Sequence, residues 1–285
     1  MYAPNQRLEV QDLLQDPPGH GEVRLAVGAA GICASDRHAV AGHMNMPLPV
    51  VIGHEGAGTV VEVGSGVTRV EPGDRCIMSF MSLCGHCRQC RAGTAMCETH
   101  ALTRNMQLDG TARLHNGDID IQQMGKIGVF AESVVVPQEA CYPLKEDLPA
   151  QVAALIGCCV TTGVGAVINS PLAKAGMTVA VFGCGGVGLN VLQGAKLMNA
   201  SRIIAVDIHS HKLEFSYKFG ATDVVNSREI DPVKAIVEMT GGGVDMAFDS
   251  FGGSTTAAAA FGSVRKGGTA VVIGLSNPGE SPPID

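Results

Sequence analysis

Four cysteines, Cys84, Cys87, Cys90 and Cys97, lie close together in the stretch CGHCRQCRAGTAMC. Gaps of two, two and six residues let their thiolates share one tetrahedral metal ion, whereas loops this short strain a disulfide. The bacterial iron–sulfur pattern has a shorter last gap and a proline after it, and here Glu98 follows. The spacing therefore predicts a zinc site that is closed by four thiolates and has only a structural role.

A zinc ion that takes part in catalysis needs an open position, and so it needs a different set of ligands. The sequence offers candidates in three separate motifs, GICASDRH, GHEGAG and GCCVTTG, which contain Cys33, His54, Glu55, Cys158 and Cys159. Taken singly, each has an ordinary explanation, because a buried cysteine is usually a small core residue. Three further cysteines are expected in core or loop packing, namely Cys76, Cys141 and Cys184.

A glycine-rich turn, FGCGGVG, places Gly183, Gly185 and Gly188 between an apolar strand and a helix. In this pattern the first glycine permits a tight turn, the second lets the backbone approach a pyrophosphate, and the third brings helix and strand together. An acidic residue, Asp207, follows about twenty residues later, where it would accept from a ribose 2′-hydroxyl and repel a 2′-phosphate. The motif predicts a dinucleotide site, with NAD preferred over NADP.

The elements around these motifs fall into two kinds. Up to about residue 150 the chain has short strands and turns, with EVRLAV and GTVVEVG as strands, and residues 103–126 are expected to form a long surface loop. After residue 170, strands alternate with helices, which predicts an α/β fold with a doubly wound parallel sheet. The expected strands are 178–182, 202–207, 223–225, 244–248 and 269–273, and the expected helices lie near 186–199, 211–219, 232–239 and 254–264.

Composition sets wider limits. A chain of 285 residues that is 46% hydrophobic and 16% charged can form two domains with real cores. The formal charge of -7 argues against a nucleic-acid partner. Neither a signal peptide nor a membrane span is expected, and the predicted location is cytoplasmic. Ten cysteines in a reducing compartment favour metal ligands and core residues over disulfides.

In this combination and order, the motifs resemble the zinc-dependent medium-chain alcohol dehydrogenases, in the branch with two zinc ions per subunit. The resemblance runs from about residue 8 to residue 276. It implies a mostly-β, GroES-like catalytic domain over residues 1–165, with the structural zinc lobe at 84–97. It also implies an NAD-binding Rossmann domain over residues 166–285 with about five strands. The cofactors would be NAD and two Zn²⁺ ions, one catalytic and one structural.

The resemblance also assigns roles to single residues. It implies that Cys33, His54 and Cys158 bind the catalytic zinc, with Cys159 as the alternative third ligand, and that Glu55 lies behind the metal. Asp36 would orient His54, while Ser35 and His38 would carry the alcohol proton away. Ala34 stands where many members have a basic residue that touches the pyrophosphate. The implied cofactor contacts are Gly183, Gly185, Gly186, Val187, Gly188, Asp207, Lys212, Thr162 and Ile273, and the implied substrate pocket contains Met44, Phe80 and Met124.

The expected activity is the reversible oxidation of a primary or aromatic alcohol to its aldehyde by hydride transfer to NAD. Two alternatives stay open: a dehydrogenase of the thiol adduct of formaldehyde, for which Arg104 and Arg113 are candidate carboxylate partners, and a non-catalytic NAD- and zinc-binding structural protein. The partners are expected to be a small-molecule substrate and, for a full-length chain, a homodimer or homotetramer. Family members extend further at both ends, so a fragment is expected, with an unpaired edge at the strand 269–273.

Overall fold

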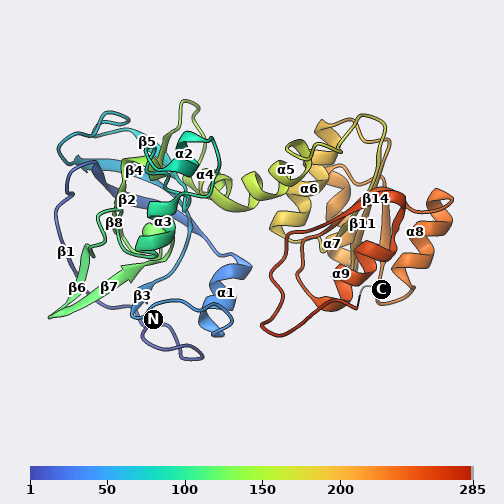
Figure 1. The fold of residues 1–285 in the computed structure, drawn as a ribbon, viewed down its shortest axis with the longest axis horizontal. Helices are drawn as coiled ribbons and strands as arrows, with labels where there is room; N and C mark the ends of the chain where they lie inside the picture. Colours follow the sequence, from blue (N-terminus) through green and yellow to red (C-terminus); the bar gives the residue numbers. More distant parts are fainter. Residues whose placement is uncertain (284–285) are drawn as a thin grey trace. The chain divides into compact units, whose positions relative to one another are not determined.

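A computed structural model describes residues 1–283 of the chain. The chain divides into two compact units, Met1–Cys158 and Cys159–Asp285, and their elements are labelled in Figure 1. The division expected from the sequence, after residue 165, falls inside the helix α5 (Thr161–Ile168).

A five-stranded antiparallel sheet forms the core of the first unit. Its strands pair in the order β8 (Ser133–Pro137), β2 (Glu22–Gly31), β4 (Glu55–Val63), β5 (Arg75–Met78) and β9 (Cys141–Pro143). Alternate residues such as Val23, Leu25 and Val134 point into the core, as half-buried strands require. The strands expected around residues 22–27 and 58–64 are confirmed.

A smaller sheet of the same unit corrects one expectation. It joins β1 (Leu14–Gln15), β6 (Leu114–Asn116), β7 (Ile119–Gln123) and β3 (Val50–Val51). Residues 103–126 are therefore not one surface loop, since they form the β6–β7 hairpin and the short helix η1 (Met124–Lys126). Three polar residues of this segment are buried and hydrogen-bonded, namely Gln107, Gln123 and Lys126. The polar sequence of the segment therefore suggested a surface loop although part of it lies in the interior.

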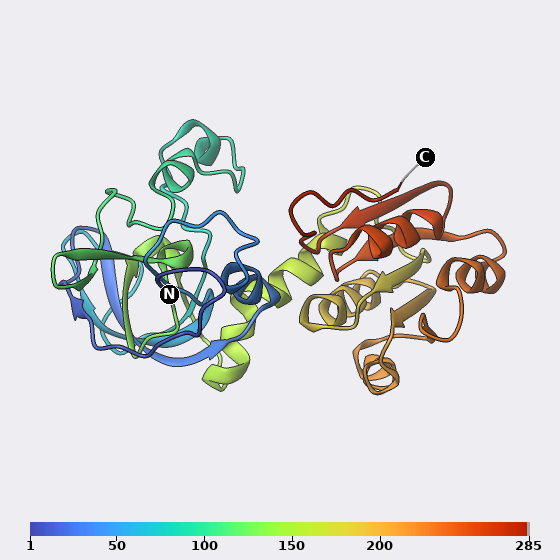
Figure 2. The same cartoon turned by 90° about the horizontal axis from the view of Figure 1, so that it is seen from below.

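The four cysteines lie on a lobe that contains two short helices, α2 (Arg88–Arg91) and α3 (Glu98–Thr103). In Figure 2 this teal segment projects from the rest of its unit. The buried Lys126 ammonium holds the end of the lobe, because it donates to the hydroxyl of Thr103 at 2.7 Å and to the carbonyls of Arg104 and Met106 at 2.6 and 2.9 Å. The remaining short helices of this unit are α1 (Ala34–Val40), η2 (Gln138–Ala140) and α4 (Ala150–Leu155).

The second unit contains a parallel five-stranded sheet, which confirms the predicted class. The strand order is β12 (Asp223–Asn226), β11 (Arg202–Asp207), β10 (Thr178–Phe182), β13 (Val244–Asp249) and β14 (Val264–Val272). Among the described residues β14 pairs only with β13. The chain reverses its direction of winding between β10 and β13, the place where open parallel sheets bind ligands.

Both faces of this sheet are covered, as buried parallel strands require. Val179, Val181 and Phe248 pack on one face with residues of α5, α6 and α7, and Ala180, Phe182 and Ala247 pack on the other with residues of α8 and α9. The helices after α5 are α6 (Gly186–Leu197), α7 (Ser210–Ser216), η4 (Tyr217–Phe219), α8 (Pro232–Thr240) and α9 (Ser254–Gly262).

One helical run, residues 150–168, is long and apolar enough to cross a membrane by length and composition alone. It consists of α4, a π-helical turn (Ile156–Val160) and α5. Ala153 and Ala154 pack in a core cluster of the first unit, and Val167 packs in one of the second.

Candidate functional site

A cluster of metal-binding groups lies within the first unit. Ligand atoms of Cys33, His54, Glu55 and Cys158 all lie within 4.8 Å of one another. Cys159, the alternative thiol, belongs to the second unit, where its sulfur lies 3.9 Å from Nδ2 of Asn190. The structure thus brings together the three residues expected to hold a catalytic zinc, with the acid expected behind it.

Asp36 organises this cluster from the first turn of α1. Its Oδ2 accepts the backbone N–H of Cys33 at 2.8 Å, and Cys33 is the N-cap residue of α1, so the two residues form a capping box. Its Oδ1 lies 3.1 Å from Nδ1 of His54 and accepts the N–H of Gly53. Since Nδ1 of His54 is engaged, Nε2 is the nitrogen left for a metal.

The electrostatics of the cluster favour a thiolate beside an imidazolium. A hydrogen bond with Cys158, opposed by burial and aided by His54, lowers the pKa of the Cys33 thiol to about 4. Burial disfavours a charge on His54, but its hydrogen bonds with Asp36 and Cys33 outweigh this and raise its pKa to about 10. Two thiols, an imidazole and a carboxylate are a donor set that suits Zn²⁺, which would take the place of the proton.

The cluster opens into a cavity of about 580 Å³. Ser35, His54 and Cys158 lie on its wall, and the apolar remainder includes Met44, Met46, Pro47, Phe80 and Met124. All three residues expected to form the substrate pocket are therefore in this cavity. Arg104 and Asn105 also line it, and the sequence alone did not predict that Asn105 would be there.

Ser35 and His38, the expected proton carriers, share no hydrogen bond in the described part of the chain. The thiol of Cys33 lies 3.8 Å from the Ser35 hydroxyl. His38 lies one turn further along α1, and within residues 1–283 its ring has a hydrogen bond to His43 and none to Ser35. His43 was not predicted from the sequence, because no familiar motif marks it.

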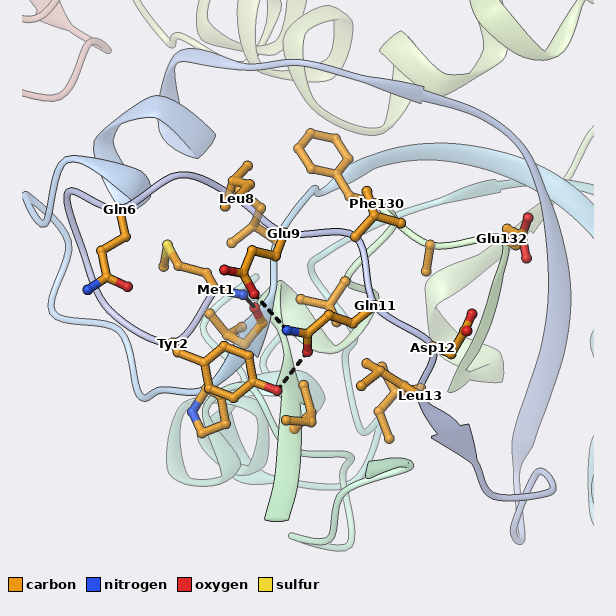
Figure 3. Close-up of a pocket in the computed structure, with 18 of the residues that line it drawn as sticks. Met1, Tyr2, Gln6, Leu8, Glu9, Gln11, Asp12, Leu13, Phe130 and Glu132 are labelled. Atoms are coloured by element: carbon orange, nitrogen blue, oxygen red, sulfur yellow. Dashed lines mark hydrogen bonds between the residues drawn. The ribbon is translucent and has the colours of Figure 1, made fainter. Parts of the chain in front are cut away.

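A larger cavity, about 850 Å³, lies elsewhere in the first unit under the N-terminal segment. Figure 3 shows Met1, Tyr2, Leu8 and Gln11 on its walls, with Tyr2 donating to Gln11 at 2.9 Å. None of the metal-cluster residues lines it. Although this cavity is larger, the smaller one is the better candidate for the reaction site, because metal-binding groups line it.

The four cysteines of the lobe form the second cluster of metal-binding groups, again within 4.8 Å of one another. Their sulfurs accept backbone N–H groups, for example Cys84 from Cys87 at 3.4 Å and Cys97 from His100 at 3.3 Å. None of the ten cysteines, all of which lie within residues 1–283, is in a disulfide. Four clustered sulfurs, of which those of Cys84, Cys87 and Cys97 accept backbone N–H groups, fit a closed zinc site.

The glycine-rich turn of the second unit has the geometry that its motif predicts. Gly183 has a φ of 92°, which favours glycine, and Gly185 caps α6 with open space around it. A side chain at Gly188 would overlap the carbonyl of Gly183, so the third glycine is needed for packing. Free N–H groups at the start of α6, which begins with Gly186 and Val187, suit a pyrophosphate.

The other expected cofactor residues lie in the same unit. Asp207, at the end of β11, accepts the N–H of Cys184 at 2.8 Å, and Lys212 Nζ lies 4.0 Å from its carboxylate. Thr162 is half-buried in α5, beside Gly163, which packs tightly against the first turns of α6. Ile273 donates its N–H to the carbonyl of Asp249 just beyond β14.

Comparison with known proteins gives the class. An alcohol dehydrogenase GroES-like domain model matches residues 19–146, and a zinc-binding dehydrogenase model matches residues 186–285. The S-(hydroxymethyl)glutathione dehydrogenase of Saccharomyces cerevisiae is 39% identical over 98% of this chain and 75% of its own length. The chain belongs to the zinc-dependent medium-chain alcohol dehydrogenase family, and it is an oxidoreductase that uses zinc and NAD.

Solved structures agree with this class. Benzyl alcohol dehydrogenase from Acinetobacter calcoaceticus is similar with a TM-score of 0.89 and 32% identity, over 97% of this chain and 76% of that one. A zinc-binding dehydrogenase from Sinorhizobium meliloti bound to NADP is similar with a TM-score of 0.78 and 32% identity, over 95% of this chain and 74% of that one.

Proposed function

We propose that this enzyme oxidises a primary or aromatic alcohol reversibly to the aldehyde, with NAD as the hydride acceptor. The observation that supports this most directly is the cavity of about 580 Å³, whose lining combines two of the clustered metal-binding groups with methionine and phenylalanine side chains. An apolar alcohol can be oriented there with its hydroxyl toward the cluster.

In this proposal Cys33, His54 and Cys158 hold the catalytic zinc, and Glu55 lies behind it. When bound, zinc supplies Lewis-acid polarisation of the hydroxyl, and NAD supplies the hydride acceptor. Asp36 keeps the imidazole of His54 oriented through Nδ1. Ser35 takes the alcohol proton at the cavity wall, and His38 moves it away from the site.

Cofactor binding in this proposal uses the second unit. The start of α6 holds the pyrophosphate through backbone N–H groups of the turn 183–188. Asp207 and Lys212 contact the adenosine ribose, and Thr162 and Ile273 contact the nicotinamide end. We further propose a cytoplasmic homodimer or homotetramer with a small-molecule substrate.

A second candidate substrate is the thiol adduct of formaldehyde, and one observation favours it. Arg104 lines the cavity, and among the described residues its side chain forms no hydrogen bond or ion pair, so its guanidinium can donate hydrogen bonds to a carboxylate. Arg113, the other candidate from the sequence, binds Glu22 at 2.7 Å and Asp109 at 2.6 Å, so its charge is already neutralised.

A substrate panel distinguishes the two candidates. NADH absorbance would be followed with the zinc-loaded protein and benzyl alcohol, 1-butanol or S-(hydroxymethyl)glutathione. We expect the highest kcat/KM with benzyl alcohol. A kcat/KM at least about tenfold higher for the glutathione adduct, lost in Arg104→Met, would establish the second candidate instead. No turnover of any of the three would contradict both.

A further inference from the structure

Helix α1 ends in a turn that places a second histidine against His38. The N–H of Gly42 donates to the carbonyl of Ala39 at 3.1 Å, and the N–H of His43 donates to the carbonyl of His38 at 2.9 Å. Gly42 has a φ of 73°, so this is a Schellman ending, in which the residue after the glycine lies against the residue three before the helix cap. An apolar pair is usual at these two positions, and here both are imidazoles.

The two rings are close enough to share a proton. Their Nδ1 atoms are 3.1 Å apart, and the ring centroids are 5.4 Å apart at an angle of 49°. A hydrogen bond between two nitrogens needs an N–H on one and a lone pair on the other. The contact therefore holds one proton between the rings, and a second proton there would set two N–H groups against each other.

The surroundings of the pair favour the neutral form of His38. Burial, then the neighbouring His43 and Arg37, lower the pKa of His38, and Cys33 opposes them. Within the described part of the chain, these three are the charged or titratable groups that shift the pKa of His38. His38 is half-buried and His43 is exposed, so the pair leads from the protein to solvent.

We propose that His43 is the outer member of the proton relay and discharges His38 into water. This inference rests on the alcohol oxidation proposed above. Nε2 of His38 accepts the proton that the reaction releases, and the Nδ1–H bond of His38 breaks as the Nδ1–H bond of His43 forms. Nε2 of His43 then gives its proton to water, so one proton enters and one leaves. His43 acts through His38 and is thus a positioning residue.

The pair can be tested without any turnover. Long-range ¹⁵N NMR of the histidine rings in the zinc-loaded protein reports the titration of His38. In His43→Asn we expect the pKa of His38 to rise, since a neighbour that lowers it has gone. His20→Asn is the matched control, because His20 is also an exposed histidine of the first unit, paired with Ser65. His43→Gln replaces His43→Asn if the latter fails to fold.

The role in transfer is tested by rate. We expect His43→Asn to lower kcat with benzyl alcohol about tenfold at pH 7, and added imidazole to restore it, since a small base can substitute for the lost ring. His20→Asn should match the parent. Unchanged His38 titration, unchanged rates, or a lower rate that imidazole does not restore would each overturn the inference while the proposed function stands. A parent that turns over no alcohol in the panel would overturn the proposed function, and the relay with it.

Discussion

The carboxylate of Asp207 is held in place before any cofactor binds. One of its oxygens accepts the N–H of Cys184 at 2.8 Å, and the other accepts the N–H of His209 at 3.0 Å. Both donors belong to the turns that flank the proposed cofactor site. In the proposed cofactor site, this fixed negative charge would lie where NADP carries its 2′-phosphate.

We expect kcat/KM with NAD to exceed that with NADP by at least about tenfold, or about 1.4 kcal/mol. Asp207→Asn should narrow this ratio because it removes the charge that repels the phosphate. Glu238→Gln is the control, since it removes an exposed carboxylate from the same unit. Initial rates with both cofactors give the answer, and equal rates in the parent would contradict this role for Asp207.

At the scale of elements, His115 on β6 forms ion pairs with residues on both sides of the strand. His115 Nε2 lies 3.0 Å from a carboxylate oxygen of Asp16, just after β1, and Nδ1 lies 3.0 Å from Asp120 on β7. The pKa of His115 is raised above its ordinary 6.5, mainly by the hydrogen bond with Asp16. Burial acts in the opposite direction but does not cancel this effect.

A group whose pKa rises on folding stabilises the fold most below its unfolded pKa. The contribution of His115 should therefore be complete below about pH 6.5 and vanish as the pH rises through its higher folded pKa. Urea unfolding of the parent and of His115→Gln should differ more at pH 5.5 than at pH 9. A difference that is the same at both pH values would show that the two ion pairs add nothing.

The sequence predicted the elements best where one pattern dominated. All five strands of the parallel sheet were predicted, because short apolar runs that alternate with helices are typical of buried parallel strands. The hairpin at 114–123 was missed, because buried Gln107 and Lys126 look like surface residues until their partners are known. His43 was missed for a similar reason, since only the turn at Gly42 brings it to His38.

At the scale of the whole molecule, two clusters of metal ligands imply two zinc ions per chain. Elemental analysis should find two, and Cys84→Ser and Cys33→Ser should each lose one. Cys84→Ser should also lower the unfolding temperature, since binding of a structural zinc contributes to folding. Cys33→Ser should abolish turnover and leave a folded protein by circular dichroism. One metal per folded parent chain would contradict the assignment.

The π-helical turn has a consequence for engineering. Cys158 and Cys159 are consecutive, yet one belongs to the metal cluster and the other to the second unit. A chimera that exchanges the second unit with that of another family member must therefore not be joined between these two residues. A junction there would combine one parent's ligand with the other parent's helical register, and a shift of one residue turns a helical side chain by about 100°. Residues 150–168 should therefore come from one parent, and the residues of α6 that pack against α5 should come from that same parent.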